Sequence, residues 1–149
     1  MIYNNPVSYK VDCTVDMLEE LSDEVMLVAV KESSDDVRRI TDIINRLGDR
    51  YQLFTGVDNL AMESLLMGAV GWVAGLVCAF PEETVAIYNL VQAGRIAEAR
   101  EIYRWFKPLL DLDVNTKLVQ NIKLAEVAVG LGTELTRPPR LPLIGDERE

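Results

Sequence analysis

The chain has 149 residues, of which 49% are apolar and 26% charged; its formal net charge is −9 and it has no histidine. Length and composition predict one globular domain with a sizeable core, and the acidic balance argues against nucleic acid and anionic membranes, which bind clustered lysine and arginine. Without histidine, the chain has no histidine-ligated metal site and no serine–histidine or cysteine–histidine nucleophile.

Neither the cysteines nor the N-terminus points to export or to a membrane. Cys13 and Cys78 form no metal-binding motif, which predicts two buried, reduced thiols. The first ten residues lack the charged-then-apolar pattern of a signal peptide. The apolar, uncharged stretch of residues 69–80 is shorter than the ~20 residues of a membrane-spanning helix. We therefore expect a soluble, cytoplasmic protein.

The first two thirds of the chain alternates between predicted strands and helices. Residues 1–6 are expected to be the last residues of a strand, and further strands are expected at residues 25–30, 51–55 and 71–77. Helices are expected at residues 15–23, 37–47, 60–67 and 81–93. Residues 25–30 are a continuous apolar run, which predicts a strand buried on both faces. This alternation is typical of right-handed βαβ units and predicts an α/β fold with a parallel sheet.

The pattern changes after Gly94 to helices without strands. Helices are expected at residues 96–110, where Pro108 interrupts the last turn, and at residues 116–129. The proline-rich stretch 137–142 cannot continue a helix and is expected to be extended. The acidic pairs Asp35/Asp36 and Glu82/Glu83 precede or open predicted helices, where negative charge complements the helix dipole, so capping is favoured over a metal site.

Lys31 does not fit its apolar surroundings. It ends a predicted parallel strand, at the edge where α/β sheets bind ligands. A lysine beside an apolar core loses solvation of its charged form, which favours the neutral amine that Schiff-base chemistry requires. Tyr3 ends the preceding strand, so its phenol could move protons beside that amine. The alternatives are a lysine that extends to water and a tyrosine that packs on Pro6. Lys117 and Lys123 are rival amines, expected to be solvated.

The residues around Tyr3 and Lys31 resemble the dihydrodipicolinate synthase / N-acetylneuraminate lyase family of class I aldolases. Residues 3–6 (YNNP) are similar to that family's YNxP motif, and residues 28–34 (VAVKESS) to its apolar strand with a KE motif. Residues 56–58 resemble the small-residue turn after the next strand, and residues 71–75 the final barrel strand. Order and spacing agree over essentially the whole chain.

The resemblance implies half of a (β/α)8 barrel over residues 1–94, a C-terminal helical extension over 95–136 and an extended tail over 137–149. It implies that Lys31 forms a Schiff base with pyruvate or another 2-oxo acid, with Tyr3 as proton relay and with Gly56 and Val73 lining the pocket. No metal or organic cofactor is then needed. Family reactions include aldol cleavage or condensation, dehydration and deamination. Ser8 stands where the synthase branch has an arginine, which argues against that branch.

The resemblance also implies that the first four βα units are absent, with the threonine loop that binds the substrate carboxylate. Open strand edges and an uncovered inner face favour association. We expect a homo-oligomer; a flattened open sandwich, or a piece of a longer protein, are the alternatives. Met26 and Val70 are apolar substitutions expected to cover exposed surface. A second hypothesis for the function is an inactive half-barrel scaffold whose main property is self-association.

Overall fold

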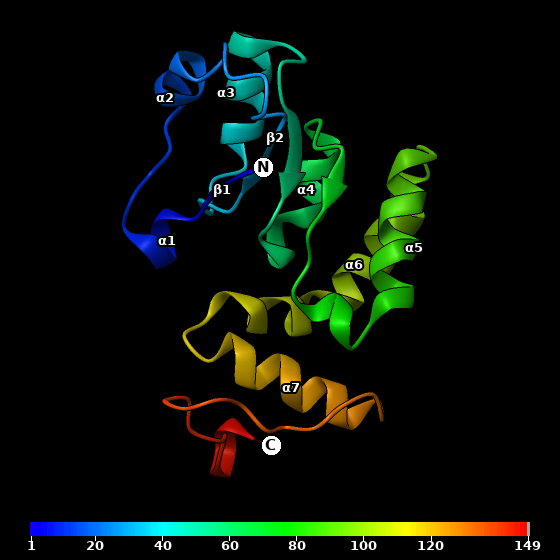
Figure 1. Cartoon of the computed structure of the whole chain (residues 1–149). Coiled ribbons are helices and arrows are strands. Elements are labelled where there is room, and N and C mark those ends of the chain that lie inside the picture. The colour runs from blue at the N-terminus through cyan, green and yellow to red at the C-terminus, as the bar shows by residue number, and fades with distance from the viewer. Residues whose placement is uncertain (149) are drawn as a thin grey trace.

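A computed structural model, which describes residues 1–148, contains one four-stranded parallel sheet in the order β1-β2-β3-β4 (Figure 1). The strands are β1 (Ile2–Asn4), β2 (Ala29–Glu32), β3 (Gln52–Thr55) and β4 (Gly71–Trp72). Neighbours in the sheet are consecutive in the chain, which is the arrangement that successive βαβ units commonly form. The predicted parallel α/β fold is confirmed.

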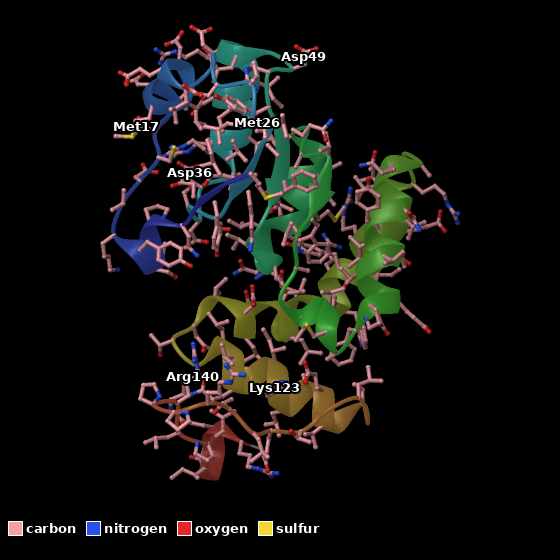
Figure 2. The ribbon with its side chains drawn as sticks, viewed as in Figure 1. Met17, Met26, Asp36, Asp49, Lys123 and Arg140 are labelled. Carbon is pink, nitrogen blue, oxygen red and sulfur yellow. The ribbon has the colours of Figure 1, made fainter. Side chains whose placement is uncertain are left out.

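Helices connect the strands and extend beyond them. They are α1 (Pro6–Tyr9), α2 (Val15–Glu20), α3 (Arg38–Leu47), α4 (Ala61–Leu66), α5 (Pro81–Gln92), α6 (Ile96–Leu110) and α7 (Leu118–Ala128), with 3₁₀ turns η1 (Asp58–Leu60), η2 (Leu76–Cys78), η3 (Asp111–Val114) and η4 (Gly145–Glu147). In Figure 1, α7 lies across the end of the molecule toward which the strands point, and the C-terminal segment runs beside it. Lys123 of α7 and Arg140 of that segment are labelled in Figure 2.

The core lies between the sheet and the helices. Val30 of β2 and Leu53 of β3 point into it and are fully or almost fully buried, with Ile40, Ile43 and Phe106 of the covering helices. Because successive side chains of a strand point to opposite faces, Lys31 and Phe54 lie on the other face. The sheet therefore presents one face to the apolar core and displays Lys31 on the opposite one.

The second strand starts later than its apolar run predicts. Val25 and Met26 are 81% and 83% exposed, and β2 begins only at Ala29. Residues 22–27 form turns whose main-chain carbonyls, at Ser22, Glu24 and Leu27, accept hydrogen bonds from the Arg50 guanidinium. These carbonyls cannot join a sheet ladder, so the prediction of a strand from Val25 was wrong. Met26 does not cover surface as expected; it is itself exposed.

The fourth strand is shorter than predicted because one buried carboxylate draws the chain out of the sheet. Asp58 is 0% exposed and accepts hydrogen bonds from the main-chain N–H groups of Gly75 and Leu76 and from the indole of Trp72. Burial raises the pKa of Asp58, and these donors oppose the shift. The segment after Trp72 consequently turns into η2, where Cys78 is exposed, contrary to its predicted burial.

A second polar network fixes the ends of the first two strands. The Asn4 amide donates to Glu32 and to Asp12, and Glu32 also accepts the Ser34 N–H. Arg39 of α3 forms a 2.8 Å salt bridge with Asp12, which lowers the pKa of that carboxyl. Buried charges are tolerated only when paired in this way. The network holds β1 and β2 in register at the edge where Tyr3 and Lys31 lie.

The bounds of the helices agree with their predicted residues more closely than the bounds of the strands do. The bounds of α6 agree with the expected residues 96–110, and α5 opens with Pro81 and with Glu82 and Glu83 in its first turn. Asp36 accepts the main-chain N–H of Arg38 at the start of α3. The four-residue helix α1 was not predicted. Within residues 1–148, no helix is long and apolar enough to cross a membrane.

Replacing Asp58 with alanine should lower the free energy of unfolding by about 2–3 kcal/mol, because two main-chain N–H groups and one indole N–H would lose their acceptor. Urea unfolding, compared with the exposed control Asp49→Ala, measures this. Equal midpoints for Asp58→Ala and the wild type would show that the carboxylate does not hold the chain after β4.

Candidate active site

A cavity of about 550 Å³ lies at the carboxyl ends of the strands. It is lined by residues from every strand end and from the segment between α6 and α7. The lining includes Tyr3, Ser8, Lys31, Ser33, Asp35, Gly56, Val73, Gly75, Asp113, Asn115 and Thr116. The four residues that the sequence singled out, Tyr3, Lys31, Gly56 and Val73, thus meet in one space. This is the edge of a parallel sheet where ligands usually bind.

Lys31 and Tyr3 are direct neighbours in this cavity. The sheet register pairs the two residues across β1 and β2, and the Lys31 Nζ lies 4.2 Å from the centre of the Tyr3 ring. The Tyr3 hydroxyl accepts a hydrogen bond from the Asn5 amide at 2.9 Å, and the ring packs edge-on against Tyr9. Tyr3 is 43% exposed. The phenol is therefore held beside the amine and is open to a molecule in the cavity.

Position 56 needs a glycine because the Lys31 side chain passes close to its main chain. A Cβ atom there would lie 2.1 Å from the Ser33 Oγ and 2.3 Å from the Lys31 Cε, so any larger residue would collide with both. The end of β3 thus leaves a channel through which the Lys31 side chain reaches the cavity. The small-residue turn seen in the sequence has this physical reason.

Ser33 contributes an unsatisfied hydroxyl that the sequence analysis did not single out. The residue is 3% exposed, and its Oγ has no hydrogen-bond partner in residues 1–148. Buried hydroxyls normally have partners, so an orphan one that lines a cavity is a ready contact for a bound oxygen atom. Its position two residues after Lys31, on the same side of the chain, was the available signal.

Asp113 is the second group that sequence analysis missed. It comes from η3, and its Oδ1 lies 2.1 Å from where a Cβ of Gly75 would be, so the carboxylate packs directly on that glycine. Burial and the charge of Asp58 raise the pKa of Asp113 to about 6, while the charge of Lys31 opposes the shift. No motif marks this residue in the sequence, because the folding of the C-terminal segment over the sheet brings it there.

The remaining candidate residues either line the cavity or form ion pairs elsewhere. Ser8 and Asp35 line the cavity, and Asp35 has a positive φ of 66°, so Asp35 is not a simple helix cap. The rival amines on or near α7 have acidic partners: Lys117 pairs with Glu147, and Lys123 with Glu126 at 3.1 Å. Among residues 1–148, no group of three or more cysteine, aspartate or glutamate side chains is arranged to hold a metal ion.

The arrangement places one amine between groups that can handle protons. A neutral lysine amine attacks carbonyl carbon, and a phenol, a hydroxyl or a carboxyl group can supply and remove the protons that such an addition moves. Lys31 is the single amine or guanidinium among the described residues that line the cavity. Carbonyl chemistry through a lysine is thus what these side chains can perform together.

Comparison with known proteins agrees with this arrangement. The model of the dihydrodipicolinate synthetase family matches residues 1–149. The 4-hydroxy-tetrahydrodipicolinate synthase of Clostridium perfringens is 30% identical over 144 residues, which are 96% of this chain and 48% of that protein.

Solved structures show the same correspondence. Dihydrodipicolinate synthase from Aquifex aeolicus superposes with a TM-score of 0.89 at 28% identity, over 99% of this chain and 50% of that one. The 4-hydroxy-tetrahydrodipicolinate synthase from Methylacidiphilum fumariolicum SolV superposes with a TM-score of 0.90 at 30% identity, over 99% and 49%.

The chain spans about half the length of the relatives that it matches. Its sheet and helices correspond to the C-terminal half of a (β/α)8 barrel and the helices that follow, so the predicted half-barrel fold is confirmed. A match over the full sequence, the shared fold and the lysine at the sheet edge lead to one conclusion: the chain belongs to the dihydrodipicolinate synthetase family.

Proposed function

We propose that this chain carries the Schiff-base centre of a lyase that acts on pyruvate or another 2-oxo acid, with Lys31 as the nucleophile. The observation that carries the proposal is the position of Lys31: its amine lies in the cavity at the sheet edge, beside the Tyr3 ring. Membership of the dihydrodipicolinate synthetase family supports the same chemistry. Schiff-base chemistry through a lysine requires no metal or organic cofactor.

The covalent step needs both the amine and a proton relay. The neutral Nζ attacks the carbonyl carbon, and a proton passes from nitrogen to the former carbonyl oxygen, which gives a neutral carbinolamine. A second proton, delivered to that hydroxyl from the relay, lets the oxygen leave as water and leaves a protonated imine. The positive imine then draws electrons from the neighbouring carbon, which weakens its bonds to hydrogen or carbon. Tyr3 is proposed to carry the protons, and the free Ser33 hydroxyl to donate a hydrogen bond to a substrate oxygen. Gly56 and Val73 line the substrate's side of the cavity.

The residue at position 8 bears on the branch of the family. Ser8 lines the cavity, and a serine cannot form the bidentate charged contact with a carboxylate that an arginine provides. We therefore propose an aldolase, dehydratase or deaminase activity in the cytoplasm rather than the synthase reaction. The proposal concerns half of a barrel, so turnover depends on what completes the site.

A second candidate function is self-association of the half barrel, without turnover of its own. Strands β1 and β4 each have one neighbour in the sheet, and apolar side chains are exposed beside both edges. Val7, Tyr9 and Val11 lie beyond β1, and Val70 and Val73 flank β4. Exposed strand edges and apolar surface favour pairing with another chain. We propose that the chain is a homo-oligomer whose copies cover these edges.

Borohydride reduction in the presence of pyruvate should attach one reduced three-carbon unit to Lys31, because reduction of an imine makes it permanent. Peptide mass spectrometry locates the adduct. Lys31→Ala should abolish it, whereas the control Lys123→Ala, whose amine pairs with Glu126, should retain it. Absence of an adduct at millimolar pyruvate, or an adduct confined to other lysines, would contradict the proposed function and favour the scaffold.

Tyr3→Phe should slow adduct formation roughly 100-fold, since the ring beside Lys31 remains but its hydroxyl is lost. The rate of adduct formation at fixed pyruvate concentration measures this, with Tyr9→Phe as the matched control. If Tyr3→Phe reacted as fast as the wild type, the phenol would not be the proton relay.

Sedimentation velocity should show a dimer or a larger assembly of the 149-residue chain. Val11→Lys, which places a charge in the exposed apolar surface beyond β1, should shift the distribution toward monomer, while Val85→Lys on α5 should not. A wild-type monomer over a wide concentration range would exclude the homo-oligomer.

A further inference from the structure

The cavity is much larger than the three-carbon acid that the Schiff-base proposal requires. Its volume of about 550 Å³ lies in the range of sites that enclose a whole drug-sized ligand. Pyruvate bound to Lys31 would fill a small part of it. The rest of the cavity would hold the part of the substrate that extends beyond the reacting carbons. The side chains that line the cavity away from Tyr3 therefore influence which substrate binds.

The wall farthest from Tyr3 is polar and acidic. The sheet order places Tyr3 on one side of Lys31 and the segment after β4 on the other, and Asp113 packs on Gly75 in that segment. Asn115 and Thr116 continue the same wall. The charged residues that line the cavity are Lys31, Asp35 and Asp113, so no second cation is available from the described residues once Lys31 has reacted.

We propose that Asp113 is a specificity-determining residue that accepts a hydrogen bond from a hydroxyl or amino group on the tail of a 2-oxo acid and rejects tails that carry a second carboxylate. The proposal rests on the Schiff-base function and adds its substrate class: a monocarboxylic 2-oxo acid with a hydrogen-bond donor beyond the reacting carbons. An acidic side chain repels a like charge and accepts hydrogen bonds from uncharged or positive donors.

The surroundings of Asp113 make this selection dependent on pH. Its pKa is raised to about 6, by burial and by Asp58, against the charge of Lys31. The lysines of the helices packed against η3 form ion pairs with other carboxylates: Lys107 of α6 pairs with Asp111, and Lys123 of α7 pairs with Glu126. Asp113 is therefore ionised above about pH 6, where rejection of a carboxylate is strong, and neutral below it, where rejection weakens.

Isothermal titration calorimetry of the whole chain tests the proposal with two probes, 2-keto-3-deoxygluconate, whose tail carries hydroxyls, and 2-oxoglutarate, whose tail carries a carboxylate. The wild type at pH 7.5 should prefer the hydroxylated acid by about tenfold or more, and Asp113→Asn should remove most of that preference. Asp111→Asn, on the same turn but paired with Lys107 outside the cavity, should keep it. The wild-type preference for the hydroxylated acid should also be smaller at pH 5 than at pH 7.5, whereas the preference of Asp113→Asn should not decrease.

An unchanged preference in Asp113→Asn, or no binding of either acid at millimolar concentration, would overturn the proposal. A separate borohydride experiment distinguishes failure of the Asp113 proposal from failure of the Schiff-base function. An adduct at Lys31 together with an unchanged substrate preference overturns the role of Asp113 alone. A changed preference without an adduct supports Asp113 as a binding residue and overturns Lys31 as nucleophile.

Thermal unfolding checks the fold of Asp113→Asn. A carboxyl whose pKa is higher when folded costs stability as the pH rises through about 4 to 6, so the variant should melt at or above the wild type at neutral pH.

Discussion

The alternation of side chains along the short strand β2 determines how this molecule can act. Val30 points into the core, so Lys31 must point to the opposite face, and Glu32 returns to the side of the helices, where Asn4 binds it. A shift of one residue in register would bury the amine in the core and expose Val30. The Asn4–Glu32–Asp12–Arg39 network resists such a shift, and Gly56 leaves the channel that the lysine needs.

A buried carboxylate connects that strand edge to the rest of the chain. Asp58 binds the main chain after β4 and thereby ends the strand, and η1, where Asp58 lies, packs against η3. This packing brings Asp113 to the wall opposite Tyr3. The C-terminal extension is therefore part of the site as well as a cover for the sheet. Burial and the neighbouring charge of Asp58 raise the pKa of Asp113 to about 6, against the opposing charge of Lys31.

Local patterns were sufficient to predict helices α2 to α7 and the parallel sheet. They also predicted that Tyr3 meets Lys31, because equivalent ends of consecutive parallel strands lie together. They failed where long-range polar contacts override an apolar run. Arg50 captures the carbonyls that precede β2, and Asp58 diverts the chain after Trp72. Asp113 could not be predicted from local patterns either, because its place in the cavity depends on how η3 and α7 fold back over the strand ends.

The central claim is that the fold delivers the Lys31 amine, and no other, to a carbonyl in this cavity. A crystal structure of the chain after reduction with pyruvate and borohydride tests it most directly. We expect continuous electron density from the Lys31 Nζ to the middle carbon of a three-carbon acid, with the Tyr3 and Ser33 oxygens facing the adduct. An empty Lys31, or density on Lys10, Lys107, Lys117 or Lys123 instead, would contradict it.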